Sequence, residues 1–341
     1  MVSQCRHPTL RPLPDPILTP SPAAGLLTGA PPTVAPWRPP AGSPGDPQFW
    51  RPVDSTFEQV LQEERARDSY PWLLIQTMAT GVPRRALYSA LGVRAGWRVL
   101  DAGTGFAPVA VEMAGAFGCQ VVGVDYDRDQ LERAAATTDA LRAVNWLQTH
   151  SAGTVKTAAT VSFAAALVGG LPFGEGTFDA VVARFLLQHV ADPSEAVGEL
   201  VRVTKPGGVV CIIDVDDGLC LSHPGPPEPV RRLEAAYQQA QQERGGDRMI
   251  GRKVPGMLDA AGVAVGHVLV LPQAAYGRTS PADWSQRLLH IRLSTFAEEI
   301  VERGLLDQAT ANEALRLLAT EEMPATTVVD MHLAVIGHRR P

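Results

Sequence analysis

An acidic residue and two glycines stand close together in the stretch VLDAGTGFAP, residues 99–108. Asp101 follows two apolar residues, and Gly103 and Gly105 come shortly after it. Because glycine has no side chain, a backbone turn built on it can approach a ligand closely. The helix-like run that follows would aim its unpaired amide groups at the same place. This spacing predicts a turn that holds a nucleotide, although Pro108 stands where the dinucleotide signature has a glycine.

A second acid, Asp125, ends another apolar run 22 residues after Gly103. A carboxylate at the end of a second strand can accept hydrogen bonds from both ribose hydroxyls, in NAD and in S-adenosylmethionine alike. The alternative is an ordinary turn aspartate that caps the next helix.

A histidine and a short run of aspartates are the candidate proton acceptors. His189 is favoured, because histidine titrates near neutral pH with an ordinary pKa of about 6.5. Asp214 and Asp216 belong to the stretch DVDDG, in which the neighbouring charges should raise the pKa of Asp214. The alternatives are a histidine satisfied by a backbone group and a solvated acidic turn. Three carboxylates also suit magnesium or calcium, but without further ligands in the sequence we expect no metal site.

Strands and helices alternate between residues 97 and 216. Fully apolar strands at this spacing predict a parallel sheet that is covered by helices on both faces. Ligands of such sheets bind at the carboxyl ends of the strands, where this chain has Asp101, Asp125, Arg184 and Asp214. The expected strands span residues 97–103, 119–125, 178–185 and 207–216, and the expected helices span residues 106–117, 129–141 and 194–204.

The two ends of the chain differ in character from this middle part. Residues 1–53 hold 14 of the 29 prolines and are expected to form a disordered arm. A capping box that starts at Ser55 should begin the first helix of a helical lid over residues 54–95. The sheet domain would then span residues 96–341, with two more strands near its end and a helical insertion at about 278–322 between them.

Composition limits the partners that we expect. The net charge is −6 and no basic tract stands out, which argues against nucleic acid. No apolar run approaches the roughly 20 residues of a membrane span, and the N-terminus lacks a signal peptide. The four cysteines show no CxxC spacing and fit reduced thiols in a cytoplasm. We expect a cytoplasmic protein, a monomer or a homodimer, whose partner is a small molecule.

The segment LPFGEGTFDAVVARFLLQHVADPSEAVGELVRVTKPGG, residues 171–208, narrows the choice of nucleotide. Together with VLDAGTG and VVGVDYDRDQLERA it resembles the class I S-adenosylmethionine-dependent methyltransferases, especially small-molecule enzymes of the menaquinone-biosynthesis-like group. Five segments occur in order at matching spacing over about residues 85–265. The resemblance implies a Rossmann-like α/β sheet of seven strands, the last one antiparallel, with a helical lid before the first strand. It also implies S-adenosylmethionine as the cofactor.

The resemblance assigns cofactor contacts to the ends of the strands. It places beside the methionine part of the cofactor the loop residues Asp101, Ala102, Gly103, Thr104 and Gly105. It places Asp125 at the ribose, and Tyr126 and Gln130 beside the adenine. The end of the fourth strand, with Ala183, Arg184 and Phe185, meets the amino-acid end of the cofactor. Leu167 and Val168 stand where the family meets the edge of the adenine.

Two residues depart from the family pattern. Ala107 replaces the third glycine of the loop, where one methyl group is a small intrusion and alanine is tolerated as a helix start. Leu167 replaces an aspartate whose carboxylate accepts the adenine amino group. Three readings follow: the amino group bonds to a backbone carbonyl or a water molecule, the cofactor binds weakly, or the fold has lost methyl transfer.

The expected activity is methyl transfer to a small, partly hydrophobic molecule, at oxygen, nitrogen or carbon. Catalysis would come mainly from holding the nucleophile against the methyl group, and a base helps when the nucleophile is a hydroxyl or an acidic carbon. His189 ranks first as that base, ahead of Asp214 and Asp216. Several aromatic and histidine side chains are candidate substrate contacts, although each is more often core: Tyr70, Trp72, His223, Trp284 and His290.

Two other classes of function stay open. One is an enzyme of the same fold that catalyses a cyclisation or rearrangement, which Leu167 favours slightly and Asp125 disfavours. The other is a non-catalytic binding protein, for which the proline-rich arm is the one hint. A dehydrogenase that uses NAD is disfavoured by Pro108 and by the downstream pattern.

Overall fold

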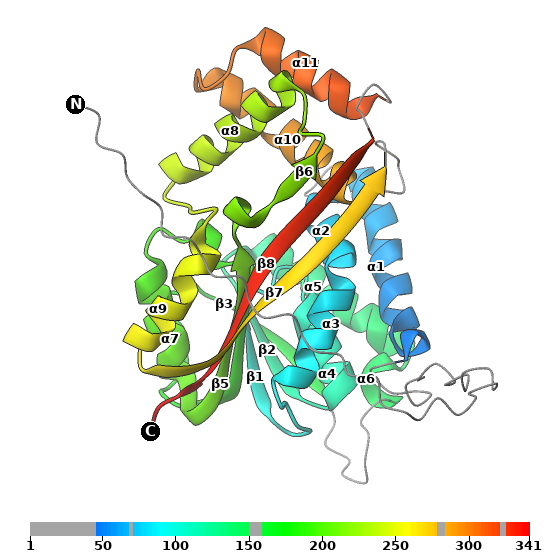
Figure 1. Ribbon diagram of the computed structural model, residues 1–341. Coiled ribbons are helices and arrows are strands. Elements are labelled where there is room, and N and C mark those ends of the chain that lie inside the picture. Colours follow the sequence, from blue (N-terminus) through cyan, green and yellow to red (C-terminus); the bar gives the residue numbers. More distant parts are fainter. Residues whose placement is uncertain (1–45, 68–70, 150–158, 278–283, 321–324) are drawn as a thin grey trace, which may run out of the picture. The chain divides into compact units, whose positions relative to one another are not determined.

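The computed structural model describes residues 46–67, 71–149, 159–277, 284–320 and 325–341. Its centre is a sheet of eight strands in the order β3-β2-β1-β4-β5-β8-β6, with β7 paired to the opposite edge of β8 (Figure 1). The strands are β1 (Arg98–Ala102), β2 (Gln120–Asp125), β3 (Thr160–Ala165), β4 (Phe178–Arg184), β5 (Thr204–Val215), β6 (Leu221–His223), β7 (Val263–Gly277) and β8 (Thr326–Arg339).

The directions of the strands are those of the predicted fold. β1 to β5 run parallel to one another, and β8 runs antiparallel to β5, β6 and β7. The predicted Rossmann-like sheet with an antiparallel last strand is therefore confirmed. The eighth strand is β6, which covers three residues and continues the pairing of β5 along the same edge of β8.

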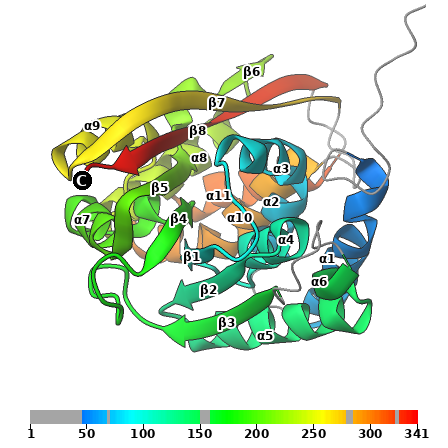
Figure 2. The same cartoon turned by 90° about the horizontal axis from the view of Figure 1, so that it is seen from below.

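Helices cover both faces of the sheet, and they are α1 (Pro47–Arg67), α2 (Pro71–Ala79), α3 (Gly81–Ala90), α4 (Pro108–Phe117), α5 (Arg128–Ala143), α6 (Trp146–Thr149), α7 (Pro193–Val203), α8 (Glu228–Glu243), α9 (Val254–Ala260), α10 (Trp284–Glu302) and α11 (Gln308–Ala319). Three short 3₁₀ turns are η1 (Leu187–His189), η2 (Asp217–Leu219) and η3 (Ile250–Lys253). Figure 2 shows α7 and α9 on one side of the sheet and α4, α5 and α6 on the other.

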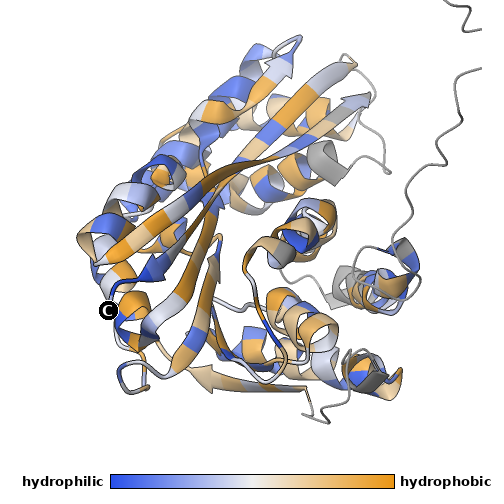
Figure 3. Cartoon of the chain, turned by 60° about the horizontal axis from the view of Figure 1, so that its bottom comes forward, coloured by the Kyte–Doolittle hydropathy of each residue, from blue (hydrophilic) through white to orange (hydrophobic). Residues whose placement is uncertain are grey.

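Successive residues of each strand alternate between two cores, because side chains of a strand point to opposite faces in turn. Val99 and Val182 belong to a core shared with α1 to α6. Leu100, which follows Val99, and Val181, which precedes Val182, belong to a second core shared with α7 and α9. Hydrophobic residues accordingly run along much of the strands, although the strands also carry hydrophilic residues, and the outer helices show hydrophilic residues between hydrophobic ones (Figure 3).

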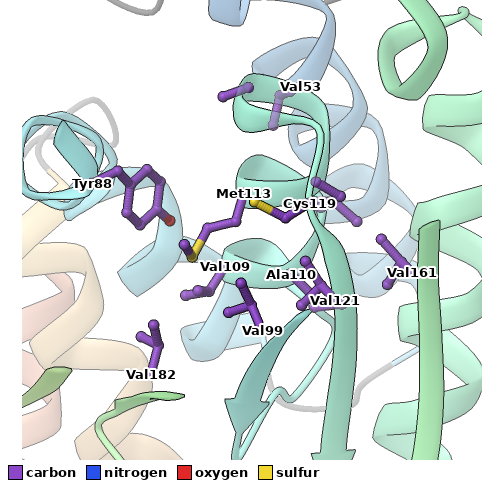
Figure 4. Packing of buried hydrophobic residues seen from close by; sticks show 14 of the residues in the cluster. Val53, Tyr88, Val99, Val109, Ala110, Met113, Cys119, Val121, Val161 and Val182 are labelled. Atoms are coloured by element: carbon purple, nitrogen blue, oxygen red, sulfur yellow. The ribbon is translucent and has the colours of Figure 1, made fainter. Parts of the chain in front are cut away.

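The helix after the glycine loop, α4, is buried from residue 108 to residue 116. A helix that is apolar all round belongs in the interior of a protein. Figure 4 shows Val109 and Met113 of α4 beside Val99 of β1, with Tyr88 of α3 nearby. The glycine loop is thus joined to an element that has little freedom to move.

The first helix begins earlier than the sequence indicated. α1 starts at Pro47, so Ser55 lies within the helix and does not cap it. Phe49 and Trp50 are buried, and their rings lie 4.8 and 5.5 Å from the ring of Trp146 in α6. The predicted boundary at residue 53 is therefore wrong, because it cuts through a helix that packs on the domain. The disorder that we predict for residues 1–45 lies outside the described residues.

Three helices form a cap on the sheet domain. α8, α10 and α11 share a small core of their own, which includes Leu233, Leu293, Ile300 and Ala314. α10 and α11 lie between β7 and β8 in the chain, where the insertion was expected, and α8 was not expected to join them. None of the described helices has the length and the hydrophobicity that crossing a membrane requires.

Candidate active site

The glycine loop leaves β1 in a left-handed backbone conformation. Gly103 and Gly105 have φ angles of +70° and +53°, which glycine adopts without steric cost. The amide groups of Gly103 and Thr104 donate to the carbonyl oxygen of Val124 at 2.8 and 2.9 Å, which ties the loop to β2. Among the described residues, no atom lies within 4 Å of the place where a Cβ on Gly105 would stand. The loop is therefore open on that side.

Ala107 takes the third left-handed position of this loop. Its φ angle is +68°, and it is the N-cap residue of α4. Alanine does stand at the helix start, as predicted, but in a conformation that costs a residue with a Cβ about 1–2 kcal/mol. Burial of its methyl group returns about 0.8 kcal/mol of that cost.

Two acids hold the loop from different sides. Asp101 is buried, and its carboxylate accepts hydrogen bonds from Thr104 Oγ1 at 2.6 Å and from the amide of Ala110 at 3.2 Å. Asp125 accepts from the amide of Gly105 at 2.9 Å and from that of Asp127 at 3.1 Å. Burial raises the pKa of Asp101 to about 6. The carboxylate of Asp101 is thus buried and hydrogen-bonded to the loop and to α4. Each oxygen of Asp125, by contrast, keeps a lone pair for a ligand hydroxyl.

Two exposed apolar side chains follow the ends of β2 and β3. Asp125 pairs with Ala165 in the sheet, so Tyr126 and Leu167 stand just beyond neighbouring strand ends. Their exposed fractions are 74% and 70%. Gln130 is 6% exposed, and its Oε1 atom has no hydrogen-bond donor among the described residues.

Arg184 is a cation without a carboxylate contact in the described part of the chain. It donates a hydrogen bond to Thr80 Oγ1 at 2.6 Å, and its guanidinium carbon lies 4.3 Å from the ring centroid of Phe185. Burial, and then the charge of Arg84, lower the pKa of Arg184 to about 9. Phe185 has a φ angle of +54°, so the backbone turns sharply here at the end of β4.

A buried ionic network joins the helical lid to α4. Glu112 accepts two hydrogen bonds from Arg84 at 2.7 and 2.8 Å, one from Arg85 at 2.9 Å and one from the Tyr88 hydroxyl at 2.5 Å. Although burial opposes it, the charge of Arg84 is the main cause that lowers the pKa of Glu112 to about 2. Arg84 also donates to Thr80 Oγ1, the atom that Arg184 uses. This network is not predicted from the sequence, because a single glutamate in a helix does not indicate which distant side chains it contacts.

The aspartates of DVDDG have structural partners. Asp214 is buried and accepts from the amides of Leu187 at 2.8 Å and Val215 at 2.9 Å. Its pKa rises to about 7, as predicted in direction, but the cause is burial and not the neighbouring acids. Asp216 is buried against Arg252, with N–O distances of 2.5 and 2.7 Å. The expectation that these acids face the substrate is therefore wrong for both, because each residue is only 1% exposed and its carboxylate is hydrogen-bonded within the protein.

His189 is the one of the three predicted acceptors that stays accessible. It lies in η1 at a surface pocket of about 140 Å³, which is also lined by Tyr237, Gln241 and Phe296 of the cap. Loss of solvent around the ring, and then the charge of Arg248, lower the pKa of His189 to about 4. No described group forms a hydrogen bond with its ring, which contradicts the alternative of a backbone-satisfied histidine.

The predicted substrate residues do not form one group. Tyr70 and the side chain of Trp284 lie outside the described residues. Trp72 of α2 is half-buried, and its Nε1 atom is sealed from solvent without a described acceptor. His290 is half-buried on α10, and burial lowers its pKa. His223 is exposed in β6 at the edge of the sheet.

Charged and titratable side chains also gather where the cap meets β8, and the sequence analysis did not select them. They are Glu234 of α8, Arg292 of α10, and Asp330 and His332 of β8. A signal was present, because an acid and a histidine two residues apart interrupt one face of an otherwise apolar strand. Across the described ranges, no group of three or more histidine, cysteine or acidic side chains could hold a metal ion.

Comparison with known proteins agrees with this geometry. A family model described as a methyltransferase domain matches residues 100–212. The chain is 30% identical over 166 residues to O-methyltransferase resE of Aspergillus sclerotiorum, which covers 48% of this chain and 56% of that protein. It is 30% identical over 141 residues to the demethylmenaquinone methyltransferase of Renibacterium salmoninarum, which covers 41% of this chain and 48% of that protein. The chain thus spans about half the length of these curated relatives.

Among solved structures, the [4+2]-cyclase SpnF is similar with a TM-score of 0.47 and 21% identity, over 78% of this chain and 83% of that one.

Proposed function

We propose that this protein transfers a methyl group from S-adenosylmethionine to a small, partly hydrophobic molecule. The match of residues 100–212 to a methyltransferase domain supports the proposal. One observation carries the proposal. The open glycine loop after β1 is hydrogen-bonded through Gly105 to the carboxylate of Asp125 at the end of β2. This brings a free backbone surface and a free acid lone pair to one place at the carboxyl edge of a parallel sheet, where nucleotides bind.

The side chains around this place suit the cofactor. The orphaned Oε1 of Gln130 is a buried acceptor, whose missing bond costs about 1–3 kcal/mol until a donor reaches it. Tyr126 and Leu167 offer exposed apolar surface against which the adenine ring can pack. The cation Arg184 stands at the end of β4, where the resemblance places the amino-acid end of the cofactor.

S-adenosylmethionine supplies an electrophilic methyl group when it is bound. The protein's part is to hold the acceptor in line with that group and to keep water away, which contributes through proximity. For a hydroxyl acceptor, His189 takes the proton. Its pKa is lowered to about 4, which keeps the ring uncharged at neutral pH but makes it a weaker base than an ordinary histidine.

Leu167 bears on the alternative in which an enzyme of this fold catalyses a cyclisation or rearrangement. Its exposed side chain offers no acceptor for the adenine amino group. This favours weak cofactor binding, but it identifies no residue for another reaction. We therefore propose methyl transfer first.

Calorimetric titration with S-adenosylmethionine tests the cofactor site. Asp125→Ala should weaken binding by about 1.5–3 kcal/mol, the range for a hydrogen bond to a charged group. Asp129→Ala, which removes an exposed acid from the first turn of α5, is the matched control and should leave the affinity unchanged. If Asp125→Ala binds as tightly as the wild type, Asp125 is a turn residue only and the proposed site fails.

A further inference from the structure

A cation without an acidic contact lies where the cap meets the sheet. Arg292 of α10 is half-buried, and its Nε atom is sealed from solvent with no acceptor among the described residues. Its guanidinium carbon lies 5.3 Å from the ring centroid of Tyr237 in α8. A guanidinium presents a planar fork of donors that matches a carboxylate, and it also stacks on aromatic rings. Arg292 therefore has a platform on one face and unused donors at its edge.

The acids in the same region do not contact Arg292. Glu234 and Asp330 lie within electrostatic range of it, and Asp217 is occupied by Arg248 at 2.7 Å. No described carboxylate comes within the 4 Å of an ion pair with Arg292. Arg184 shares this feature, whereas Arg84 meets Glu112 and Arg248 meets Asp217, each at 2.7 Å.

His332 relates this cation to the end of β4, where the resemblance places the amino-acid end of the cofactor. The ring of His332 in β8 lies 4.7 Å from the ring of Phe185, at the end of β4. Burial first, and then the charges of Arg184, Arg248 and Arg292, lower the pKa of His332 to about 3. His332 is thus in range of both Arg184 and Arg292, and it links the end of β4 to the cap.

We propose that Arg292 binds a carboxylate of the methyl acceptor beside the surface pocket of about 140 Å³ that Tyr237 and Phe296 line. As a statement about the acceptor, this rests on the proposed function. The acceptor class is then a small organic acid. A bidentate carboxylate would satisfy donors that the fold leaves without partners, since charge-assisted paired hydrogen bonds are the strong ones.

Binding of such an acid should take up a proton. Three charged groups act on Glu234 of α8: Arg292 of α10, Asp217 of η2 and Asp330 of β8. Asp330 is in turn within range of Arg292, Asp217 and Arg248, and it has a hydrogen bond with Cys220. Burial raises the pKa of Glu234 to about 7. A ligand carboxylate adds one more negative charge here, so it favours the protonated form of Glu234. Affinity should therefore rise as the pH falls through about 7.

Calorimetric titration of the full chain with benzoate, which is ionised throughout pH 6 to 8, tests the site. Benzamide has the same shape without the charge, and it should bind at least about tenfold more weakly at pH 6. Arg292→Gln should lose benzoate binding by a similar factor. Arg231→Gln, an exposed arginine of α8 that pairs with Glu228, should bind as the wild type does. Equal binding of benzoate and benzamide, or unchanged binding by Arg292→Gln, overturns the proposal.

The pH dependence separates a carboxylate site from a merely structural arginine. Wild-type affinity for benzoate should be about tenfold higher at pH 6 than at pH 8, which is the protonation ratio of a group with a pKa of about 7. Glu234→Gln should bind benzoate at both pH values as tightly as the wild type does at pH 6. If the pH dependence persists in Glu234→Gln, the assigned linkage is wrong.

Titration of the same samples with S-adenosylhomocysteine distinguishes the two proposals. If the wild type binds S-adenosylhomocysteine but not benzoate, this inference alone is overturned. Specific benzoate binding by a protein that binds no S-adenosylhomocysteine supports the carboxylate site and overturns its place in methyl transfer.

Discussion

Glu112 is the residue on which the contact between lid and sheet domain most depends. It is a fully buried carboxylate on α4 that faces two arginines and a tyrosine of α3. Removing one partner of a buried ion pair leaves the other charge uncompensated, and this costs more than the pair itself contributes. The lid residue Arg84 would be that stranded charge.

Glu112→Gln should therefore lower the free energy of unfolding by about 3–5 kcal/mol. The pKa of Glu112 is lowered to about 2 from an ordinary value of 4.5, so its stabilisation is present above pH 4.5 and is lost as the pH falls toward 2. Urea unfolding at pH 7 measures the loss, and unfolding at pH 3 should show a smaller difference between variant and wild type. Glu132→Gln, at an exposed acid of α5, is the control and should stay within about 0.5 kcal/mol.

At His189 the expected effect is on chemistry and not on cofactor affinity. With a hydroxyl acceptor, His189→Ala should lower kcat by about 10²–10⁴, the usual contribution of a general base. S-adenosylmethionine affinity should change less than twofold, because no cofactor contact is assigned to this ring. His267→Ala, at an exposed histidine of β7, controls for the substitution itself. A change in kcat of less than tenfold would contradict the general-base role of His189, and proximity alone would then account for catalysis.

Among the elements, α1 shows how a composition signal can hide a packed helix. Its first turns contain Pro47 and Pro52, which made the segment look like the end of a disordered arm. Proline is tolerated in the first turn of a helix, where Pro47 lies, because the missing amide has no partner to lose there. Pro52 lies inside the helix and costs it one backbone hydrogen bond. The apolar residues between the prolines decide the outcome, because Phe49, Trp50 and Val53 are all buried.

Two truncated chains test this boundary. A chain that starts at Asp46 should melt within a few degrees of the full protein. A chain that starts at Asp54 loses two buried aromatic side chains and one valine, each aromatic worth about 3–5 kcal/mol. Its Tm should fall by at least about 10 °C, measured by circular dichroism or differential scanning calorimetry. Equal melting of the two chains would mean that residues 46–53 contribute no stability.

On the scale of the whole molecule, buried acids set how stability changes with pH. Burial raises the pKa of Asp101 to about 6, and that of Asp214 and Glu234 to about 7, against ordinary values near 4. The folded chain holds these protons at a pH where the unfolded chain has released them. Stability contributed by these groups is therefore highest below about pH 4 and decreases as the pH rises to 7.

Unfolding by urea at pH 5 and pH 7.5 measures this dependence. These three acids make the wild type less stable at pH 7.5 than at pH 5, whereas the lowered pKa values of His189 and His332 act in the opposite direction. Asp214→Asn should reduce the difference, because the amide keeps the acceptor oxygen but no longer titrates. Asp129→Asn, at an exposed acid, should leave the difference as it is. A larger difference in Asp214→Asn than in the wild type would contradict the assigned sign.

The sequence by itself determined the sheet and the position of the loop beside it. Apolar strands that alternate with helices allow few other arrangements, and left-handed glycines mark a turn without reference to distant residues. Asp125 was found in the same way, since a strand end is a local feature. The residues that need distant partners were decided only by the tertiary structure. Asp214 and Asp216 looked free in the sequence, and the fold gave their oxygens to the η1 amides and to Arg252. Arg292 looked like an ordinary helix arginine, and the fold left it without an acid. Whether a charged group is paired depends on elements far apart in the chain, and no local pattern records their approach.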